Sequence, residues 1–321
     1  MEVFMATKVS SLTESGILAG ITVVMAIIAM YVPLVGILAV LLWPLPMILL
    51  LVRHGLKWAL MSVATAIVVT AALVEPMASL RLAVSFAPTG LALGIGYRRH
   101  WSGVKIFSTA TIASIIAKGL GLYIVFLITG IEPFSGQLEL MPQQFEQSVA
   151  MYQSMGMSPE QIEQARQNFM ENMRMISLLL PMVVLIMGIL DTALNFWAGG
   201  IMLRRFGEPV PVFPAFTEWR LPSFFAYLYA FSILGMYWGD THSIPLLYKI
   251  AVNMNMAGTV AGLVQGVSVY QAAVSHYKWP SLMSNIVMVL LVLSGIGTQL
   301  IVFTGLFDTV FDYRRRMGWQ K

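Results

Sequence analysis

Residues 103–130 read GVKIFSTATIASIIAKGLGLYIVFLITG, and this stretch decides the class of protein. After Lys105 it carries a single charged residue, Lys118. As a helix it exceeds the about 20 apolar residues that a bilayer core of about 30 Å requires. The whole chain of 321 residues shares this character, because 58% of its residues are apolar and 11% are charged. A soluble domain has about 25% charged residues, so the composition excludes a soluble globular protein and a disordered chain.

Comparable stretches recur along the chain and predict an all-α fold, a polytopic transmembrane helical bundle of eight or nine spans. We place the spans at residues 12–31, 35–52, 57–74, 77–97, 103–130, 174–202, 222–238, 245–274 and 281–307. Pro44 and Pro46 predict a kink in the second span, and Asn253 and Asn255 predict a break or a strong tilt in the eighth. Ser11-Leu12-Thr13-Glu14 has capping-box spacing, which predicts that the first helix begins there.

The basic residues predict the orientation of the chain in the membrane. With the amino terminus inside, the inner loops hold Arg53, Lys57, Arg98, Arg99, Lys105, Arg204, Arg205, Arg220 and Lys278. The outer loops hold only Arg166 and Arg174, with Arg81 near a boundary. This bias predicts a multi-pass protein of the bacterial cytoplasmic membrane whose amino terminus is inside and whose first span is retained rather than cleaved as a signal peptide.

The carboxyl-terminal tail conflicts with a count of nine crossings. Nine crossings place Arg314, Arg315 and Arg316 outside, although basic residues prefer the inner side. We therefore expect the tail to be cytoplasmic, and we expect one segment after residue 206 to be misassigned as a crossing.

The polar and proline-rich stretches divide the chain into three parts. Residues 1–206 form a six-span membrane unit that includes an extracytoplasmic helical insert at 131–173, where Ser158-Pro159-Glu160 predicts a helix start. Residues 207–222 contain four prolines and predict a stiff connector. Residues 223–321 hold the last membrane helices and the basic tail.

Two charged residues fall inside predicted spans at a matching depth. Lys118 and Asp191 lie about 13 and about 12 residues from the inner ends of their spans, which is roughly 18–20 Å. Equal depth on consecutive spans favours an ion pair between them. Such a pair either fixes the helix register or contacts a charged ligand. The remaining alternative is that the two residues do not pair. Asn195 lies one helical turn after Asp191 on the same face. These three residues are our first candidates for substrate binding.

Other polar residues carry weaker signals. Glu75 and Arg81 flank the outer junction of the third and fourth spans, either as solvated boundary charges or as part of a ligand site. The amides of the last spans are expected to bridge helices. They are Asn253, Asn255, Gln265, Gln271, Asn285 and Gln299.

Missing motifs narrow the function. The chain has no cysteine, no P-loop, no H-E-x-x-H and no G-x-S-x-G, so we expect neither enzymatic activity nor a cofactor, a metal or a nucleic-acid partner. Two methionine clusters leave Cu(I) binding open, although packing or lipid contact is the favoured reading. The clusters are Met151, Met155 and Met157, and Met170, Met173 and Met175.

Three segments of the first half resemble the substrate-binding S components of energy-coupling factor (ECF) transporters. They are GILAGITVVMAIIA at 16–29, VRHGLKWALMSVATAI at 52–67 and RLAVSFAPTGLALGIGYRRH at 81–100. The resemblance covers residues 12–206. It implies a unit that binds a small molecule from the outer side, near Glu75, Arg81 and Lys118. It also implies that Gly16, Ala19 and Gly20 meet a transmembrane coupling subunit, which works with separate ATPases; internal packing of the same helix is an equal alternative.

The whole chain resembles the uncharacterised family of bacterial membrane proteins typified by YybS. The connector PVFPAFTEWRLP at 211–222 and the ending GLFDTVFDYRRR at 305–316 carry this resemblance. It implies an S-component-like fold with added carboxyl-terminal helices. Two functions follow as hypotheses. One is an S-component-like part of a transport system that binds a small molecule and has no ATPase of its own. The alternative is a non-transporting membrane assembly protein, an envelope scaffold or a sensor.

Overall fold

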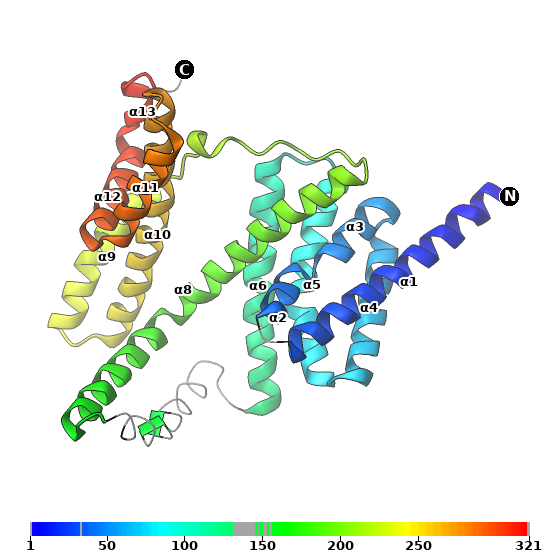
Figure 1. Ribbon diagram of the computed structural model, residues 1–321, viewed down its shortest axis with the longest axis horizontal. Coiled ribbons are helices and arrows are strands. Elements are labelled where there is room, and N and C mark those ends of the chain that lie inside the picture. Colours follow the sequence, from blue (N-terminus) through cyan, green and yellow to red (C-terminus); the bar gives the residue numbers. More distant parts are fainter. Residues whose placement is uncertain are drawn as a thin grey trace. The chain divides into compact units, whose positions relative to one another are not determined.

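The computed structural model describes residues 2–32, 34–130, 145–146, 148–149, 153 and 156–319, and the regular elements in these ranges are helices (Figure 1). The helices of the first half are α1 (Glu2–Tyr31), α2 (Val35–Leu42), α3 (Leu45–His54), α4 (Leu56–Leu73), α5 (Pro76–Arg98) and α6 (Gly103–Thr129). Those of the second half are α8 (Pro159–Arg205), a 3-10 turn η1 (Phe216–Glu218), α9 (Phe224–Thr241), α10 (Pro245–His276), α11 (Ser281–Leu293), α12 (Gly295–Phe311) and α13 (Tyr313–Arg316).

Most of these helices are suited to a membrane. Among the described residues, seven segments are long and apolar enough to cross one, of which Val35–His54 comprises α2 and α3 together. The bent pair α11 and α12 makes an eighth if it counts as one span. The seven are Leu12–Tyr31, Val35–His54, Leu56–Leu73, Pro76–Arg98, Gly103–Ile128, Leu178–Arg205 and Pro245–His276. The predicted polytopic helical bundle is therefore confirmed. Helix α9 covers the span expected at 222–238 but is not among the seven.

Local predictions about helix ends had mixed outcomes. The kink in the second span is confirmed, because Trp43 and Pro44 separate α2 from α3. Of the two alternatives predicted for the eighth span, the break is wrong, since α10 is one helix of 32 residues, and the strong tilt stays a prediction. The start predicted for α8 is confirmed by a capping box, in which Ser158 and Gln161 bond each other's backbone N–H.

The start predicted for the first helix is wrong. Helix α1 already begins at Glu2, so Ser11–Glu14 lies inside the helix rather than at its end. The Glu14 carboxylate instead pairs with Arg53 and with His54, whose Nε2 lies 2.6 Å from Glu14 Oε2. This contact joins α1 to the basic end of α3.

The chain folds into two compact units. The first comprises Met1–Glu163 and Val183–Phe213, and the second comprises Gln164–Met182 and Pro214–Lys321. The chain passes between the units after Phe213, inside the connector expected at 207–222. Residues 164–182, the amino-terminal part of α8, group with the second unit, although we had placed them in the first part of the chain.

The core of the first unit forms around α3. Its residues Met47–Leu51 are all buried, and they pack against the glycine-rich face of α5. A Cβ added at Gly94 would lie 3.0 Å from Leu51 Cβ, so a larger residue there would push the two helices apart. The glycines of α5 thus serve close packing of α5 on α3 and α6.

The second unit is built on α10, with α9 and α12 along its sides (Figure 1). Helices α10 and α12 meet backbone to backbone, because Gly262 and Gly266 face Gly305 with no side chain between them. Small residues spaced four apart allow this close approach within a membrane.

Helices α11 and α12 form a sharply bent pair at the end of the second unit. They meet at Ser294 with a bend of 104°, so residues 281–307 are not the straight crossing that we expected. The ring of Trp319 lies 6.2 Å from that of His276 and 5.9 Å from that of Tyr277, between ring centroids. The chain therefore returns to the end of α10 from which α11 departs, and the basic tail lies on the same side as Lys278.

Single cysteines will test this topology without background, because the chain has none of its own. We expect Tyr277→Cys and Met317→Cys to react with a membrane-impermeant maleimide from one side, and Ser243→Cys, in the turn between α9 and α10, from the other. Labelling of intact spheroplasts and of inverted vesicles will show the sides. Labelling of positions 277 and 317 from opposite sides would make the pair a true crossing.

Candidate functional site

Asp191, on α8, is the centre of a buried polar cluster in the first unit. Its side chain is 0% exposed. Its Oδ2 accepts hydrogen bonds from Lys118 Nζ at 2.6 Å, Ser114 Oγ at 2.8 Å and Thr89 Oγ1 at 3.0 Å. Its Oδ1 accepts one from Asn195 Nδ2 at 2.9 Å. A single carboxylate therefore joins α5, α6 and α8.

Helical spacing explains how the cluster forms. Ser114 and Lys118 lie one turn apart on α6, and Asp191 and Asn195 lie one turn apart on α8, so each pair shares a face. Lys118 Nζ also donates to Ser114 Oγ at 2.9 Å. Asn195 Nδ2 also donates to the carbonyl of Leu41 at 2.7 Å, which brings the end of α2 to the same place. The predicted ion pair and the predicted partnership with Asn195 are both confirmed.

The two partners of the ion pair differ in exposure. Asp191 is enclosed and surrounded by four donors, which satisfies a carboxylate far from water. The Lys118 side chain is 14% exposed, and its Nζ lies 4.6 Å from the ring centroid of Phe86, in the range of a cation–π contact. The carboxylate is thus bonded only to protein groups and is fully buried, whereas the ammonium group belongs to a side chain that is partly exposed.

Three polar groups have unused bonding capacity: Lys118, which contacts Asp191 from α6, and Thr192 and Asn195, which lie within a turn of Asp191 on α8. The Lys118 ammonium has three protons, and its two acceptors among the described residues are Ser114 and Asp191. Asn195 Oδ1 and Thr192 Oγ1 are buried and have no hydrogen-bond partner within the described ranges. A buried polar atom without a partner costs about 1–3 kcal/mol, so these groups favour binding of a further polar molecule.

Glu75 and Arg81 do not join this cluster. Both are exposed near the amino-terminal end of α5, where Glu75 is the residue before the first helical residue. On the same helix Thr89 reaches Asp191, and the rise of a helix puts Arg81 about 12 Å and Glu75 about 21 Å from Thr89 along the axis. Their assignment to a shared ligand site stays a prediction.

The small residues of α1 do not share one environment. Ala19 is buried, whereas Gly16 and Gly20 are exposed and a Cβ added at either would have nothing within 4 Å. Internal packing therefore uses Ala19, and the two glycines lie open. The role of this face in binding a partner stays a prediction.

The methionine clusters are only partly visible. Met151 and Met155 lie outside the described residues, as does the side chain of Met175. Within the ranges that the structure describes, no group of three or more His, Asp or Glu side chains could hold a metal ion. Copper binding by the methionines stays a prediction.

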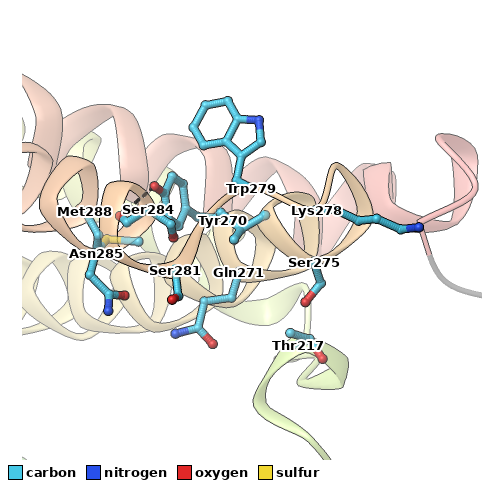
Figure 2. A pocket seen from close by; sticks show the side chains of 11 residues that line it. Thr217, Tyr270, Gln271, Ser275, Lys278, Trp279, Ser281, Ser284, Asn285 and Met288 are labelled. Carbon is cyan, nitrogen blue, oxygen red and sulfur yellow. Dashed lines mark hydrogen bonds between the residues drawn. The ribbon is translucent and has the colours of Figure 1, made fainter.

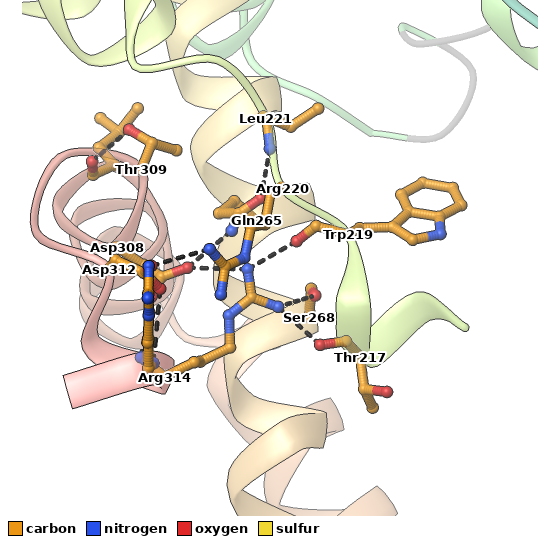
Figure 3. Close-up of polar contacts among 12 residues, drawn as sticks. Thr217, Trp219, Arg220, Leu221, Gln265, Ser268, Asp308, Thr309, Asp312 and Arg314 are labelled. Atoms are coloured by element: carbon orange, nitrogen blue, oxygen red, sulfur yellow. Dashed lines mark hydrogen bonds and ion pairs between the residues drawn. The ribbon is translucent and has the colours of Figure 1, made fainter. Parts of the chain in front are cut away.

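A second buried cluster centres on Arg314 in the second unit (Figure 3). Its side chain is 0% exposed, and its Nη2 lies 3.0 Å from Asp308 Oδ2. The guanidinium also donates to the carbonyls of Thr217 and Trp219, at 2.6 Å each, and to Ser268 Oγ at 3.1 Å. The proline-rich connector is thus tied to the end of the chain.

Three amides of α10, those of Asn253, Asn255 and Gln265, bridge helices as predicted, whereas bridging by Gln271, Asn285 and Gln299 stays a prediction. Gln265 Nε2 donates to Asp308 Oδ2 at 2.7 Å, and Gln265 Oε1 accepts from the backbone N–H of Leu221 at 3.0 Å. Asn253 Nδ2 donates to the carbonyl of Leu178 on α8, and Asn255 Nδ2 donates to Ser232 Oγ on α9.

Sequence reasoning missed several members of both clusters. Ser114 carried a signal, because it precedes Lys118 by one helical turn. Thr89 and the carbonyl of Leu41 carried none, since contacts between distant helices do not follow from spacing along the chain. Arg314 was expected only as part of a cytoplasmic tail, and its burial was missed; it is buried where its guanidinium binds the carbonyls of the irregular connector.

The apolar helices and the buried ion pairs together define a multi-pass integral membrane protein. The chain belongs to the family described as predicted membrane protein (DUF2232), whose model matches residues 20–309. It is similar to the uncharacterized protein YybS of Bacillus subtilis (strain 168), with 24% identity over 312 residues, which cover 96% of this chain and 98% of that relative. No solved structure matches the chain. The resemblance to the YybS family is therefore confirmed.

A double-mutant cycle will test whether Lys118 and Asp191 are energetically coupled. We expect Lys118→Met and Asp191→Asn each to lower the free energy of unfolding by about 3 kcal/mol, because each leaves an opposite charge buried without compensation. The double variant should lose less than the sum by at least about 1 kcal/mol. The free energy of unfolding of the wild type and the three variants is measured in mixed micelles. Strictly additive losses would rule out the coupling.

Limited proteolysis will test the role of Arg314 in holding the connector. Trypsin cuts after Arg220, which lies beside the carbonyls that Arg314 binds. We expect Arg314→Met to speed this cut about tenfold. The variant lacks the three hydrogen bonds and the ion pair that hold the connector, so the connector opens more often. The exposed neighbour Arg315→Met is the matched control. Equal cutting rates in the two variants would contradict the tie.

Proposed function

We propose that this protein binds a small polar molecule from the outer side of the bacterial cytoplasmic membrane and serves as an S-component-like part of a transport system. The unused bonding capacity around Asp191 carries this proposal. A cluster that only fixed helix register would satisfy all its members. Here one donor and two acceptors remain available in the interior of a membrane unit, where polar groups are costly unless they have a use.

The roles within the proposed site follow from burial. Asp191 holds the Lys118 ammonium in place and has no capacity left for a ligand. Lys118 then offers a proton to a carboxylate, phosphate or carbonyl of the ligand, as charge-assisted hydrogen bonds are among the stronger polar contacts. Asn195 Oδ1 and Thr192 Oγ1 accept from N–H or O–H groups of the same molecule. We infer a ligand that carries both an anionic or carbonyl group and a donor.

Two observations support access from the outer side: the position of Lys118 along α6 and the basic residues at one end of that helix. Lys118 lies about 16 Å from the Thr129 end of α6 and about 22 Å from its Gly103 end along the axis. The basic residues Arg98, Arg99 and Lys105 lie at the Gly103 end, and basic loops favour the cytoplasm. With the amino terminus inside, the nearer end of α6 faces outward, and Glu75 and Arg81 lie along the proposed entry path.

Uptake would need partners, because the sequence offers no nucleotide-binding motif. The proposed partners are a transmembrane coupling subunit and its ATPases, and the chain itself acts as a binding protein without enzymatic activity. The open glycines of α1, Gly16 and Gly20, leave room for close approach of a partner helix. The lipid bilayer is the remaining partner.

Native mass spectrometry of the protein, released gently from its own membrane, tests this proposal. We expect a reproducible small-molecule adduct that falls about tenfold in Lys118→Met, since a charge-assisted bond is lost. The matched control is Lys57→Met, because Lys57 is exposed at the start of α4.

The outcomes separate the proposal from its alternative. Thermal unfolding must show that Lys118→Met remains folded. An adduct that Lys118→Met keeps would move the site elsewhere. A chain that carries bound envelope proteins and no small molecule would favour a scaffold.

A further inference from the structure

A cavity of about 520 Å³ lies in the second unit, between the end of α10 and the start of α11 (Figure 2). It is far in sequence from the Asp191 cluster and shares no residue with it. The hydroxyl of Tyr270 on α10 donates to the carbonyl of Ser284 on α11 at 2.9 Å and holds the two helices together beside the cavity. Its volume is typical of sites for small molecules.

The lining combines one cation with neutral hydrogen-bonding groups. Figure 2 shows the amides of Gln271 and Asn285 and the hydroxyls of Ser275 and Ser281 along the cavity, with Lys278 extending at its rim. The described lining contains no carboxylate. Such a wall disfavours a cation and suits a group that bears a negative charge together with hydroxyls.

The charges nearby reinforce this preference. Lys278 is exposed and has no ion-pair partner within the described part of the chain. The bent pair of α11 and α12 brings the tail to the same end of α10, so Arg315 and Arg316 add two further exposed cations there. The carboxylates of Asp308 and Asp312 are already paired with arginines.

Helix α11 is amphipathic across this cavity. Ser281, Ser284, Asn285 and Met288 face the cavity, at the spacing of one helical face. The other side of α11 is exposed and apolar. It consists of Leu282, Met283, Ile286, Val289, Leu290 and Leu293. Since α10 is a candidate span that ends at His276, the cavity lies where a span leaves the membrane.

We propose that this cavity binds the headgroup of an anionic phospholipid, with the phosphate at Lys278 and the headgroup hydroxyls at the amides and hydroxyls of α10 and α11. The apolar side of α11 then lies against the acyl chains. A lipid fits better than a free phosphate, because the polar cavity and the apolar helix surface adjoin along one element.

Native mass spectrometry with added lipid tests the proposal on the full chain. The probes are phosphatidylglycerol and phosphatidylcholine with identical acyl chains. We expect phosphatidylglycerol to be retained preferentially and Lys278→Asn to lower its retention about tenfold, since the phosphate loses its charged donor. Asparagine is chosen because position 278 has a φ of 53°, which asparagine tolerates.

Three controls make the outcome decisive. Lys249→Asn removes an exposed lysine from the opposite end of α10 and should leave retention unchanged. Lys118→Met should also leave it unchanged, which separates this site from the one proposed above. Asn285→Leu leaves the turn at position 278 unchanged and should also lower retention. A loss in this variant shows that the effect of Lys278→Asn does not come from a disturbed turn alone.

The alternatives remain distinguishable. Displacement of the lipid by millimolar inorganic phosphate would show that phosphate alone is recognised. Equal retention of the two lipids, or equal losses in Lys278→Asn and Lys249→Asn, would overturn the proposal.

Discussion

The need to compensate the buried carboxylate of Asp191 organises the first unit. A carboxylate without partners is too costly in a membrane interior, so donors must come from every side. Thr89, Ser114, Lys118 and Asn195 provide them from three helices. The glycine-rich face of α5 permits this convergence, because it lets α5 approach α3 closely while Thr89 reaches α8. Packing and electrostatics therefore impose the same helix register.

In the second unit the buried charge is positive, and the Arg314 guanidinium must find acceptors. The proline-rich connector has carbonyls that no regular helix satisfies, and Arg314 binds two of them while it pairs with Asp308. Gln265 completes the arrangement by linking Asp308 to the backbone of the connector. Arg314, which sequence reasoning assigned to a cytoplasmic tail, thus belongs to the core of the second unit.

Features with a local cause were predictable from the sequence. The apolar spans, the kink at Pro44 and the helix start at Ser158 follow from composition and from capping chemistry, and the pairing of Lys118 with Asp191 follows from equal depth. Long-range contacts were not predictable in this way. Thr89 and the carbonyl of Leu41 reach the Asp191 cluster from other helices, and nothing in the spacing along the chain marks them. The bend at Ser294 has a local cause that we did not use, because Ser294 Oγ accepts a hydrogen bond from the Gly297 N–H and caps α12. The capping box expected at Ser11 failed because a helix that already runs through it needs no cap.

The division of α8 between the two units has a consequence for synthesis. Residues 164–182 leave the ribosome before the helices of the second unit exist, and Asn253, which bonds Leu178, follows later. During that interval the carbonyl of Leu178 lacks the partner that it has in the finished protein. The nascent chain therefore passes through a stage in which residues 164–182 of α8 lack the contacts with α10 that they have in the finished protein.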